Sequence, residues 1–183
     1  GLKPETDRAV ARAVAKAAPK GAFLWADANQ GFDLEGAIRA AGFLKDEGIQ
    51  VLEQPLPKTD FEGMRKLRAA VSIPLAVDEA CVTPDDFRRH LTEKLVNFLV
   101  VKITRSGGIE PSLDQIALAK AAGLSLLLSG LTDSFLVKIA ACQLMSVFGF
   151  TGPAALNGSQ FLDESEFFPD KGDFEREGSV RLP

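Results

Sequence analysis

Four residues that could carry chemistry each end a short apolar run of the sequence. They are three carboxylates and one amine, and they recur every 24 to 26 residues along the chain: Asp27, Glu53, Asp78 and Lys102. A nearly constant period of this length is typical of a repeated supersecondary unit. Because each unit has the pattern of a strand, a loop and a helix, the four side chains are expected at the ends of four consecutive strands.

Three of these side chains have the chemistry of a metal site. Carboxylates that meet at one point repel one another unless a cation neutralises them. Ligands that are all oxygen, with no His or Cys nearby, favour Mg²⁺, with Mn²⁺ as a second candidate, over zinc. The alternative is a purely structural role, in which each acid only caps the helix after it. That role is plausible for one residue and far less so for three at matching positions. We therefore predict a metal site made by Asp27, Glu53 and Asp78.

The fourth residue, Lys102, ends an apolar run and is the candidate catalytic base. Burial and a neighbouring cation both favour the neutral form of an amine, which can accept a proton. A divalent ion beside a lysine suits the removal of a proton α to a carboxylate, because the metal stabilises the enediolate that results. The alternatives are that Lys102 only pairs with one of the acids, or that it forms a Schiff base as in an aldolase.

Other polar residues receive weaker assignments. Ser129 and Asp133 lie at and just beyond the end of a later apolar run and are candidate substrate contacts, although Asp133 could instead cap the helix that follows. His90 follows two arginines and is expected on a helix surface, exposed to solvent. Trp25 is expected to fill the interior of the fold.

The chain alternates strand and helix patterns along its length. Helical periodicity covers about 4–18, 34–47, 60–70, 84–91, 110–122 and 132–147, and extended runs end at the four residues above and cover 124–129 and 154–157. A loop is expected at 104–108, a break at Gly130, and an irregular polar tail over 163–183. Strict alternation of this kind predicts a parallel sheet with right-handed connections.

Two closures of such a sheet are open, a doubly wound sheet and a (β/α)₈ barrel. Polar residues at the ends of nearly all strands favour the barrel, since an open sheet concentrates its ligand groups at one switch point. No Gly-x-Gly-x-x-Gly follows the first strand. We expect an α/β fold, a partial (β/α)₈-type barrel of about six parallel strands. Residues 1–162 would form this part of the barrel domain.

Composition narrows the class of protein. The 183 residues are 46% hydrophobic and 25% charged, as in ordinary globular domains, and the net charge of −4 argues against a nucleic-acid partner. No run is long enough to span a membrane, and two cysteines do not make a disulfide framework. A cytoplasmic, homo-oligomeric enzyme for a small carboxylate substrate is the expectation.

Taken together, the residues resemble the enolase superfamily, and within it the muconate lactonizing enzyme subgroup. The resemblance is carried by these segments: Asp27-Ala28-Asn29, Leu52-Glu53-Gln54-Pro55, Val77-Asp78-Glu79, Lys102 with Ser106-Gly107-Gly108, and Leu156-Asn157-Gly158. It implies a barrel in which the three acids bind Mg²⁺ and Lys102 is one of two acid–base lysines. It also implies that Asn29 and Glu79 support the metal shell and that Asn157, on the last strand, is a candidate substrate contact.

The sequence departs from the pattern of this family in two ways. The partner lysine of the family lies in a Lys-x-Lys motif that would precede Gly1, as would a capping domain and two barrel strands, so N-terminal segments of the same protein are expected as partners. Dipeptide epimerases of the family resemble an Asp-x-Asp pattern where this chain has Ala155-Leu156-Asn157. That activity is therefore disfavoured, as is the mandelate racemase subgroup, which uses a His base from the seventh strand.

The expected function is that of a Mg²⁺-dependent isomerase or lyase. Cycloisomerisation, N-acylamino acid racemisation and β-elimination to an o-succinylbenzoate-like product all fit the same residues. The alternative is a non-catalytic, truncated barrel fragment that needs the missing N-terminal part for activity.

Overall fold

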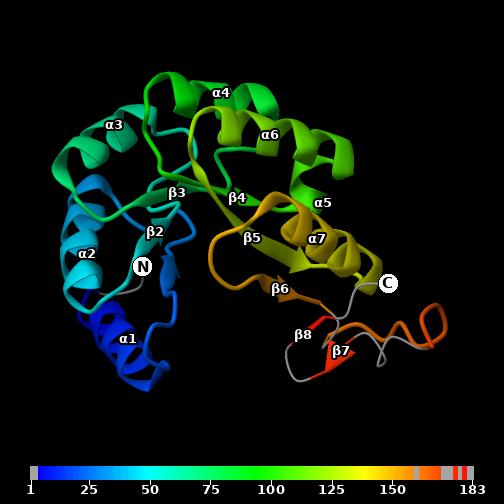
Figure 1. Cartoon of the computed structure of the whole chain (residues 1–183). Helices are drawn as coiled ribbons and strands as arrows, with labels where there is room; N and C mark the ends of the chain where they lie inside the picture. The colour runs from blue at the N-terminus through cyan, green and yellow to red at the C-terminus, as the bar shows by residue number, and fades with distance from the viewer. Residues whose placement is uncertain (1–3, 159–160, 170–174, 177–178, 181–183) are drawn as a thin grey trace.

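The computed structural model describes residues 4–158, 161–169, 175–176 and 179–180. Its main sheet has six parallel strands in sequential order, which curl into an open arc with β1 and β6 at its two ends (Figure 1). The strands are β1 (Trp25–Asp27), β2 (Val51–Glu53), β3 (Leu75–Val77), β4 (Phe98–Val101), β5 (Ser125–Thr132) and β6 (Ala155–Asn157). The predicted partial barrel of about six parallel strands is confirmed.

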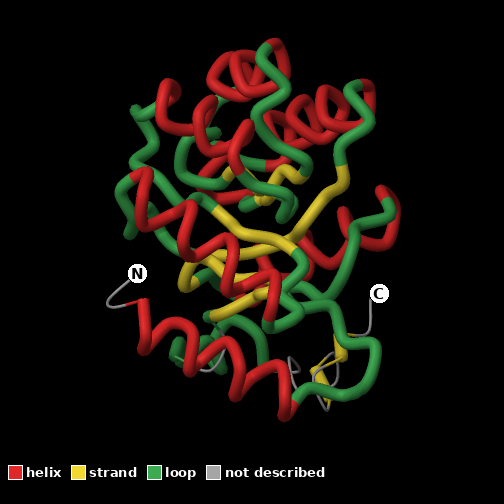
Figure 2. The backbone as a smooth tube through the Cα atoms, turned by 90° about the vertical axis from the view of Figure 1, so that its left-hand side faces the viewer, coloured by secondary structure: helices red, strands yellow, loops and turns green. Residues whose placement is uncertain are grey.

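Seven helices alternate with these strands in the described part of the chain. They are α1 (Pro4–Ala17), α2 (Leu34–Asp46), α3 (Phe61–Ala70), α4 (Pro84–Thr92), α5 (Ile103–Ser106), α6 (Ile109–Ala121) and α7 (Phe135–Phe148). Figure 2 shows the strands at the centre of the molecule with the helices around them. Two of these helices begin with side-chain caps: the side chain of Asp33 accepts from the Gly36 amide at 2.7 Å, and Thr83 forms a capping box with Asp86.

The strands bury one set of side chains outward and another inward, because successive residues of a strand point to opposite faces. The outward set joins the helices in the main core, to which β2, β4 and β5 contribute Leu52, Leu99, Val101, Leu126 and Leu128. The inward set is a smaller apolar layer made by Val51, Ala76, Val100 and Leu127, against which Phe23, Trp25 and Phe98 pack.

The register of the strands places the four charged residues at the strand ends on the same side of this inner layer. They are Asp27, Glu53, Asp78 and Lys102. Each lies two residues beyond an inward-facing residue of its own chain segment, so alternation points it into the arc as well. Asp27 pairs directly with Glu53, whereas Glu53 pairs with Ala76, which places Asp78 further along its strand direction. The inner row therefore changes from apolar to charged at the carboxyl ends of the strands.

Three local predictions differ from the structure. The loop expected at 104–108 contains the helical turn α5, which ends at Gly107 in a left-handed conformation with φ of 94°. Strand β5 continues past Gly130 to Thr132, where it pairs with Asn157 after a register shift. Helix α7 starts at Phe135 and is capped by Ser134, so Asp133 is not its cap.

His90 was predicted to be exposed, and this is wrong. Its side chain is 1% exposed, and its ring lies 4.8 Å from the ring of Phe61 on α3. Burial lowers the pKa of His90, and Nδ1 lies 3.2 Å from the Asp86 carbonyl oxygen. The two arginines that precede His90 gave no sign that it lies on the buried side of α4.

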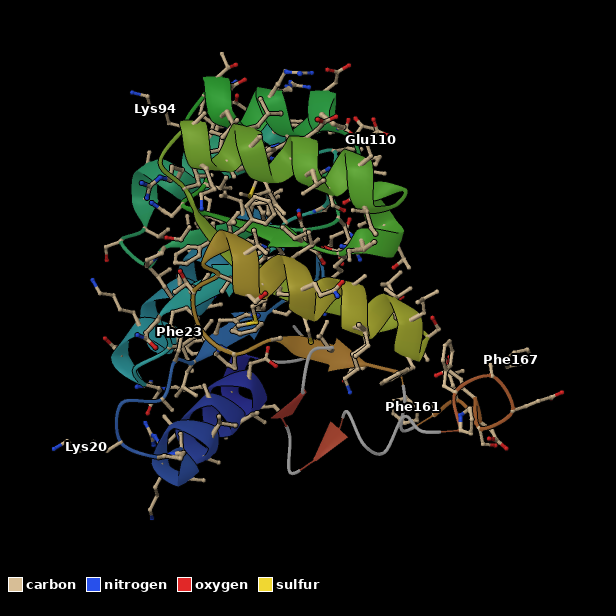
Figure 3. All side chains as sticks on the ribbon, turned by 45° about the vertical axis from the view of Figure 1, so that its right-hand side comes forward. Lys20, Phe23, Lys94, Glu110, Phe161 and Phe167 are labelled. Atoms are coloured by element: carbon tan, nitrogen blue, oxygen red, sulfur yellow. The ribbon has the colours of Figure 1, made fainter. Side chains whose placement is uncertain are left out.

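The irregular polar tail predicted over 163–183 lies partly outside the described residues. Glu175–Arg176 and Ser179–Val180 pair as a short antiparallel ladder, β7 and β8. Upstream of it, Phe161 and Phe167 are 70% and 76% exposed and extend away from the barrel (Figure 3). Among the described residues, no helix combines the length and the apolar character that a membrane span needs.

Candidate active site

Three strand ends bring their carboxylates together. Asp27, Glu53 and Asp78 each offer one oxygen atom, and these three atoms all lie within 4.8 Å of one another. Asp27 is exposed, whereas Glu53 and Asp78 are each 1% exposed. The three acids predicted to share a site therefore do meet at one place, one from each of three consecutive strand ends.

Glu53 is buried and has one carboxylate oxygen without a hydrogen-bond donor among the described residues. Its Oε2 accepts a hydrogen bond of 2.8 Å from Trp25 Nε1, while its Oε1 is buried with no hydrogen-bond partner in the described structure. Burial first, and the charge of Asp27 second, raise the pKa of Glu53 to about 7. A buried oxygen without a donor, beside two more carboxylates, fits a hard divalent cation that takes oxygen ligands.

We expect the stability of the metal-free protein to fall as the pH rises from 4.5 to 7. The pKa of Glu53 is raised from 4.5 to about 7, so the native state holds this proton more tightly than the unfolded state within that window. At about 1.4 kcal/mol per pKa unit, the free energy of unfolding should decrease by roughly 3 kcal/mol across it. Chemical denaturation in a chelator at several pH values measures this, and Glu53→Gln should flatten the dependence. A wild-type profile already flat over this window would contradict the expectation.

The turn that carries Asp78 is held by Gln54, a residue to which the sequence assigned no role of its own. Gln54 is 1% exposed, and its Oε1 accepts from the amides of Asp78 and Ala80, both at 3.1 Å. Its Nε2 donates to the Leu56 carbonyl at 3.0 Å, and its φ of 35° lies in the left-handed region. Gln54 therefore orders the backbone around the third carboxylate. A polar residue directly after Glu53 and before a proline was the only signal of it in the sequence.

Two cationic side chains contact the carboxylate of Asp78. Lys102 Nζ donates to Asp78 Oδ2 at 2.6 Å, and Arg105 Nη1 forms an ion pair with Asp78 Oδ1. The ion pair that was the alternative for Lys102 is thus present. An ion pair alone does not exclude proton transfer, because the same amine also lines an open cavity. Arg105 was missed as a site residue, although its place three residues after Lys102 could have indicated it.

A cavity of about 530 Å³ lies in front of these groups. Its walls come from both ends of the strand order and include Phe23, Leu24, Trp25, Asp27, Asn29, Glu53, Lys102, Arg105, Ser129, Gly130, Leu131, Ala155 and Asn157. One wall is charged and belongs to β1, β2 and the segment after β4. The wall from β5 and β6 contributes no carboxylate to this lining. A cavity of this size fits a small-molecule substrate.

The remaining predicted residues divide into two groups. Asn29, Ser129 and Asn157 line the cavity. The backbone N–H of Asn29 donates to Asp27 Oδ1 at 2.8 Å, and Ser129 Oγ donates to the Ala155 carbonyl at 3.3 Å. Glu79 lines a separate pocket of about 320 Å³ with Lys58 and Arg89, and burial raises its pKa. Glu79 is not one of the three clustered carboxylates.

Asp133 has contacts other than those predicted for it. It is 8% exposed and does not appear among the described residues that line the cavity. Its Oδ1 accepts from Thr104 Oγ1 at 2.9 Å, and its Oδ2 accepts from the Leu131 amide at 2.8 Å. The carboxylate is therefore engaged with the protein itself.

Known proteins are similar to this chain in sequence and in fold. A family model described as enolase C-terminal domain-like matches residues 1–183. The chain is 32% identical over 169 residues to an aromatic dipeptide epimerase of Herpetosiphon aurantiacus, a match that covers 91% of this chain and 47% of that protein. It is 30% identical over 124 residues to muconate cycloisomerase 1 of Rhodococcus opacus, covering 68% of this chain and 33% of that protein.

A solved structure matches over the whole chain. It is a dipeptide epimerase from Cytophaga hutchinsonii, complexed with Mg and the dipeptide D-Ala-L-Val, with a TM-score of 0.85 and 25% sequence identity. The match covers 100% of this chain and 50% of that chain. The chain thus spans half or less of the length of these relatives.

Proposed function

This chain belongs to the enolase C-terminal domain-like family, and on that premise we propose that its protein removes a proton from the α-carbon of a carboxylate substrate. The single observation behind the proposal is that a cluster of three carboxylates meets one cavity, where Asp27, Glu53 and Lys102 form part of the lining and Lys102 contacts the third acid, Asp78. The relatives named in the comparisons are isomerases. Because the chain spans half or less of their length, the activity is proposed for the intact protein.

The chemistry proposed for Lys102 is a proton exchange. Its neutral amine accepts the α-proton, and the electron pair of the broken C–H bond moves towards the substrate carboxylate. Return of a proton to the same carbon completes an isomerisation, and loss of a leaving group from the neighbouring carbon completes an elimination. The low exposure of the lysine side chain, 7%, keeps the amine away from bulk water while the cavity gives access to substrate.

The proposed cofactor is Mg²⁺, with Mn²⁺ as the second candidate. Asp27, Glu53 and Asp78 would hold it, since their oxygens converge and one of them is buried without a donor. A bound divalent cation would neutralise the negative charge that develops on the substrate carboxylate. Asn29 and Glu79 are proposed to support this site from outside the three ligands.

The substrate class follows from the uncharged wall of the cavity. Ser129, Ala155 and Asn157 offer hydroxyl, methyl and amide groups to the part of the substrate that faces β5 and β6. A substrate ammonium would find no carboxylate on that wall, so we favour cycloisomerisation, N-acylamino acid racemisation or β-elimination. Dipeptide epimerisation is the second candidate, because two of the matched relatives carry that name.

Solvent-deuterium exchange tests the proposal. The intact protein with Mg²⁺ in D₂O is expected to incorporate deuterium at the α-carbon of N-acylamino acids or of muconate-type lactones, detected by NMR or mass spectrometry. Free dipeptides should exchange more slowly, because their ammonium lacks a partner. Faster exchange with dipeptides would reverse the order of the two candidates. Absence of exchange in every class, with bound Mg²⁺ verified, would rule out the proposed activity.

The alternative, a non-catalytic barrel fragment, predicts a different experimental result. A protein that only resembles these enzymes is expected to show neither a saturable Mg²⁺ site nor exchange.

A homo-oligomeric state, a cytoplasmic setting and partner segments from the N-terminal side of the same protein stay predictions of the sequence. Size-exclusion chromatography with light scattering would measure the oligomeric state.

A further inference from the structure

The turn α5 holds two cations at the cavity wall. Lys102 directly precedes it and Arg105 lies within it, and both line the cavity. The turn has few backbone hydrogen bonds of its own. The Ser106 amide donates to the Lys102 carbonyl at 3.0 Å, the Gly108 amide donates to the Ile103 carbonyl at 2.9 Å, and the Gly107 amide donates to the Ile103 carbonyl as well. So short a helical segment is not stable by itself and needs contacts from neighbouring elements.

One such contact comes from Asp133. Thr104 of α5 donates its hydroxyl to Asp133 Oδ1 at 2.9 Å. The other carboxylate oxygen accepts from the Leu131 amide, and the Asp133 amide donates to the Asn157 carbonyl at 3.3 Å. Asp133 therefore joins α5 to the ends of both β5 and β6.

The chain leaves room for Asp133 on two sides. A Cβ atom on Gly130 would lie 2.8 Å from Asp133 Oδ2, and one on Gly158 would lie 1.8 Å from the Asp133 carbonyl oxygen. Any larger residue at either glycine would push Asp133 out of its place. The two glycines, which appear in the sequence as chain breakers, instead allow a close approach around this carboxylate.

The second contact comes from α6. Ser106 donates its hydroxyl to Gln115 Oε1 at 3.0 Å, and Gln115 Nε2 donates to the Val82 carbonyl at 3.0 Å. Gln115 is 1% exposed, and a buried amide is costly unless its groups are bonded in this way. The amide thereby joins the end of α5 to the loop that follows Asp78.

We propose that Asp133 and Gln115 are positioning residues that hold α5 from two sides, so that Lys102 and Arg105 face the cavity. Neither touches the cavity itself in the described structure, so both act through Thr104 and Ser106. The inference deepens the proposed function and rests on it for its catalytic consequence. Its structural part, the bracing of α5, can be tested without any substrate.

Hydrogen exchange measures the bracing directly. In Thr104→Val and in Ser106→Ala, the amides of 103–108 should exchange about five- to tenfold faster, since each variant removes one side-chain hydrogen bond. Thr104→Ser keeps the hydroxyl and should restore the wild-type rate. Thr92→Val is a matched control, because the Thr92 hydroxyl donates to the Arg88 carbonyl on the distant surface of α4. Unchanged exchange over 103–108 in both variants would overturn the bracing.

Kinetics of the intact protein test the catalytic consequence. Thr104→Val should lower kcat for α-proton exchange about tenfold, because a small displacement of a catalytic group is costly, while KM and Mg²⁺ affinity stay close to wild type. Thr104→Ser should recover kcat. Faster hydrogen exchange with an unchanged kcat would overturn the positioning role. If the wild-type protein did not exchange the α-proton of any substrate, the proposed function would be contradicted. The amide hydrogen-exchange result would still decide whether α5 is braced.

Discussion

Replacing Lys102 by alanine is expected to lower the rate of α-proton exchange by about 10²- to 10⁴-fold, the usual contribution of a positioned general base. Lys102 is the only lysine among the described residues that line the cavity, and the variant removes its amine. The binding of Mg²⁺ should persist, because the three carboxylates stay in place. Single-turnover deuterium exchange, followed by NMR, measures the loss on each face of the substrate separately.

Two further variants separate proton transfer from charge. Lys102→Arg keeps the positive charge beside Asp78 but replaces a base with a group that does not lose its proton, so it should be as inactive as Lys102→Ala. Lys20→Ala changes an exposed lysine at the surface and should leave the rate unchanged (Figure 3). Wild-type exchange on both faces in Lys102→Ala would remove this lysine from the mechanism.

Replacing Glu53 by glutamine is expected to abolish the binding of Mg²⁺ at millimolar concentrations. The change keeps the shape of the side chain and an oxygen that can accept from Trp25 Nε1, and it removes one of the three converging charges. In the wild type, Mg²⁺ at a hundred times its dissociation constant should stabilise the protein by about 2.7 kcal/mol. Isothermal titration calorimetry, and thermal unfolding with and without Mg²⁺, measure the two effects.

The same substitution should stabilise the metal-free protein. A neutral amide removes the cost of burying a carboxylate beside Asp27, so at pH 8 in a chelator the melting temperature of Glu53→Gln should exceed that of the wild type. At pH 5 the difference should shrink, because wild-type Glu53 is then protonated. Glu110→Gln, at an exposed residue of α6, is the matched control and should change neither property (Figure 3). Retained Mg²⁺ binding in Glu53→Gln would show that the metal site has been placed wrongly.

Sequence reasoning performed best where the chain repeats a simple pattern. Apolar alternation followed by a charged residue, at intervals of 24 to 26 residues, predicted the strands and the convergence of Asp27, Glu53 and Asp78. Such a pattern is informative because in parallel strands the direction of a side chain depends only on its parity along the strand. The helix cap at Asp33 is likewise a local feature, because its carboxylate accepts from the Gly36 amide three residues later.

The sequence was weaker wherever partners are far apart in the chain. Nothing local to His90 indicated that Phe61 would cover it, and nothing local to Asp133 indicated that its partner is Thr104, 29 residues earlier. Gly130 has the local character of a strand break, yet β5 continues through it because the missing side chain makes room for Asp133. These outcomes depend on how elements pack, which residue types and spacing do not determine.

The sequence by itself thus determined the fold class and the row of strand-end groups, since both follow from the two-residue period of a strand and the repeat of one supersecondary unit. The tertiary structure alone decided how those groups meet: Arg105 against Asp78, Gln54 behind it, and α5 held between Asp133 and Gln115. The physical reason is that hydrogen bonds and ion pairs need atoms within about 3 Å. Only the packing of whole elements brings distant segments that close.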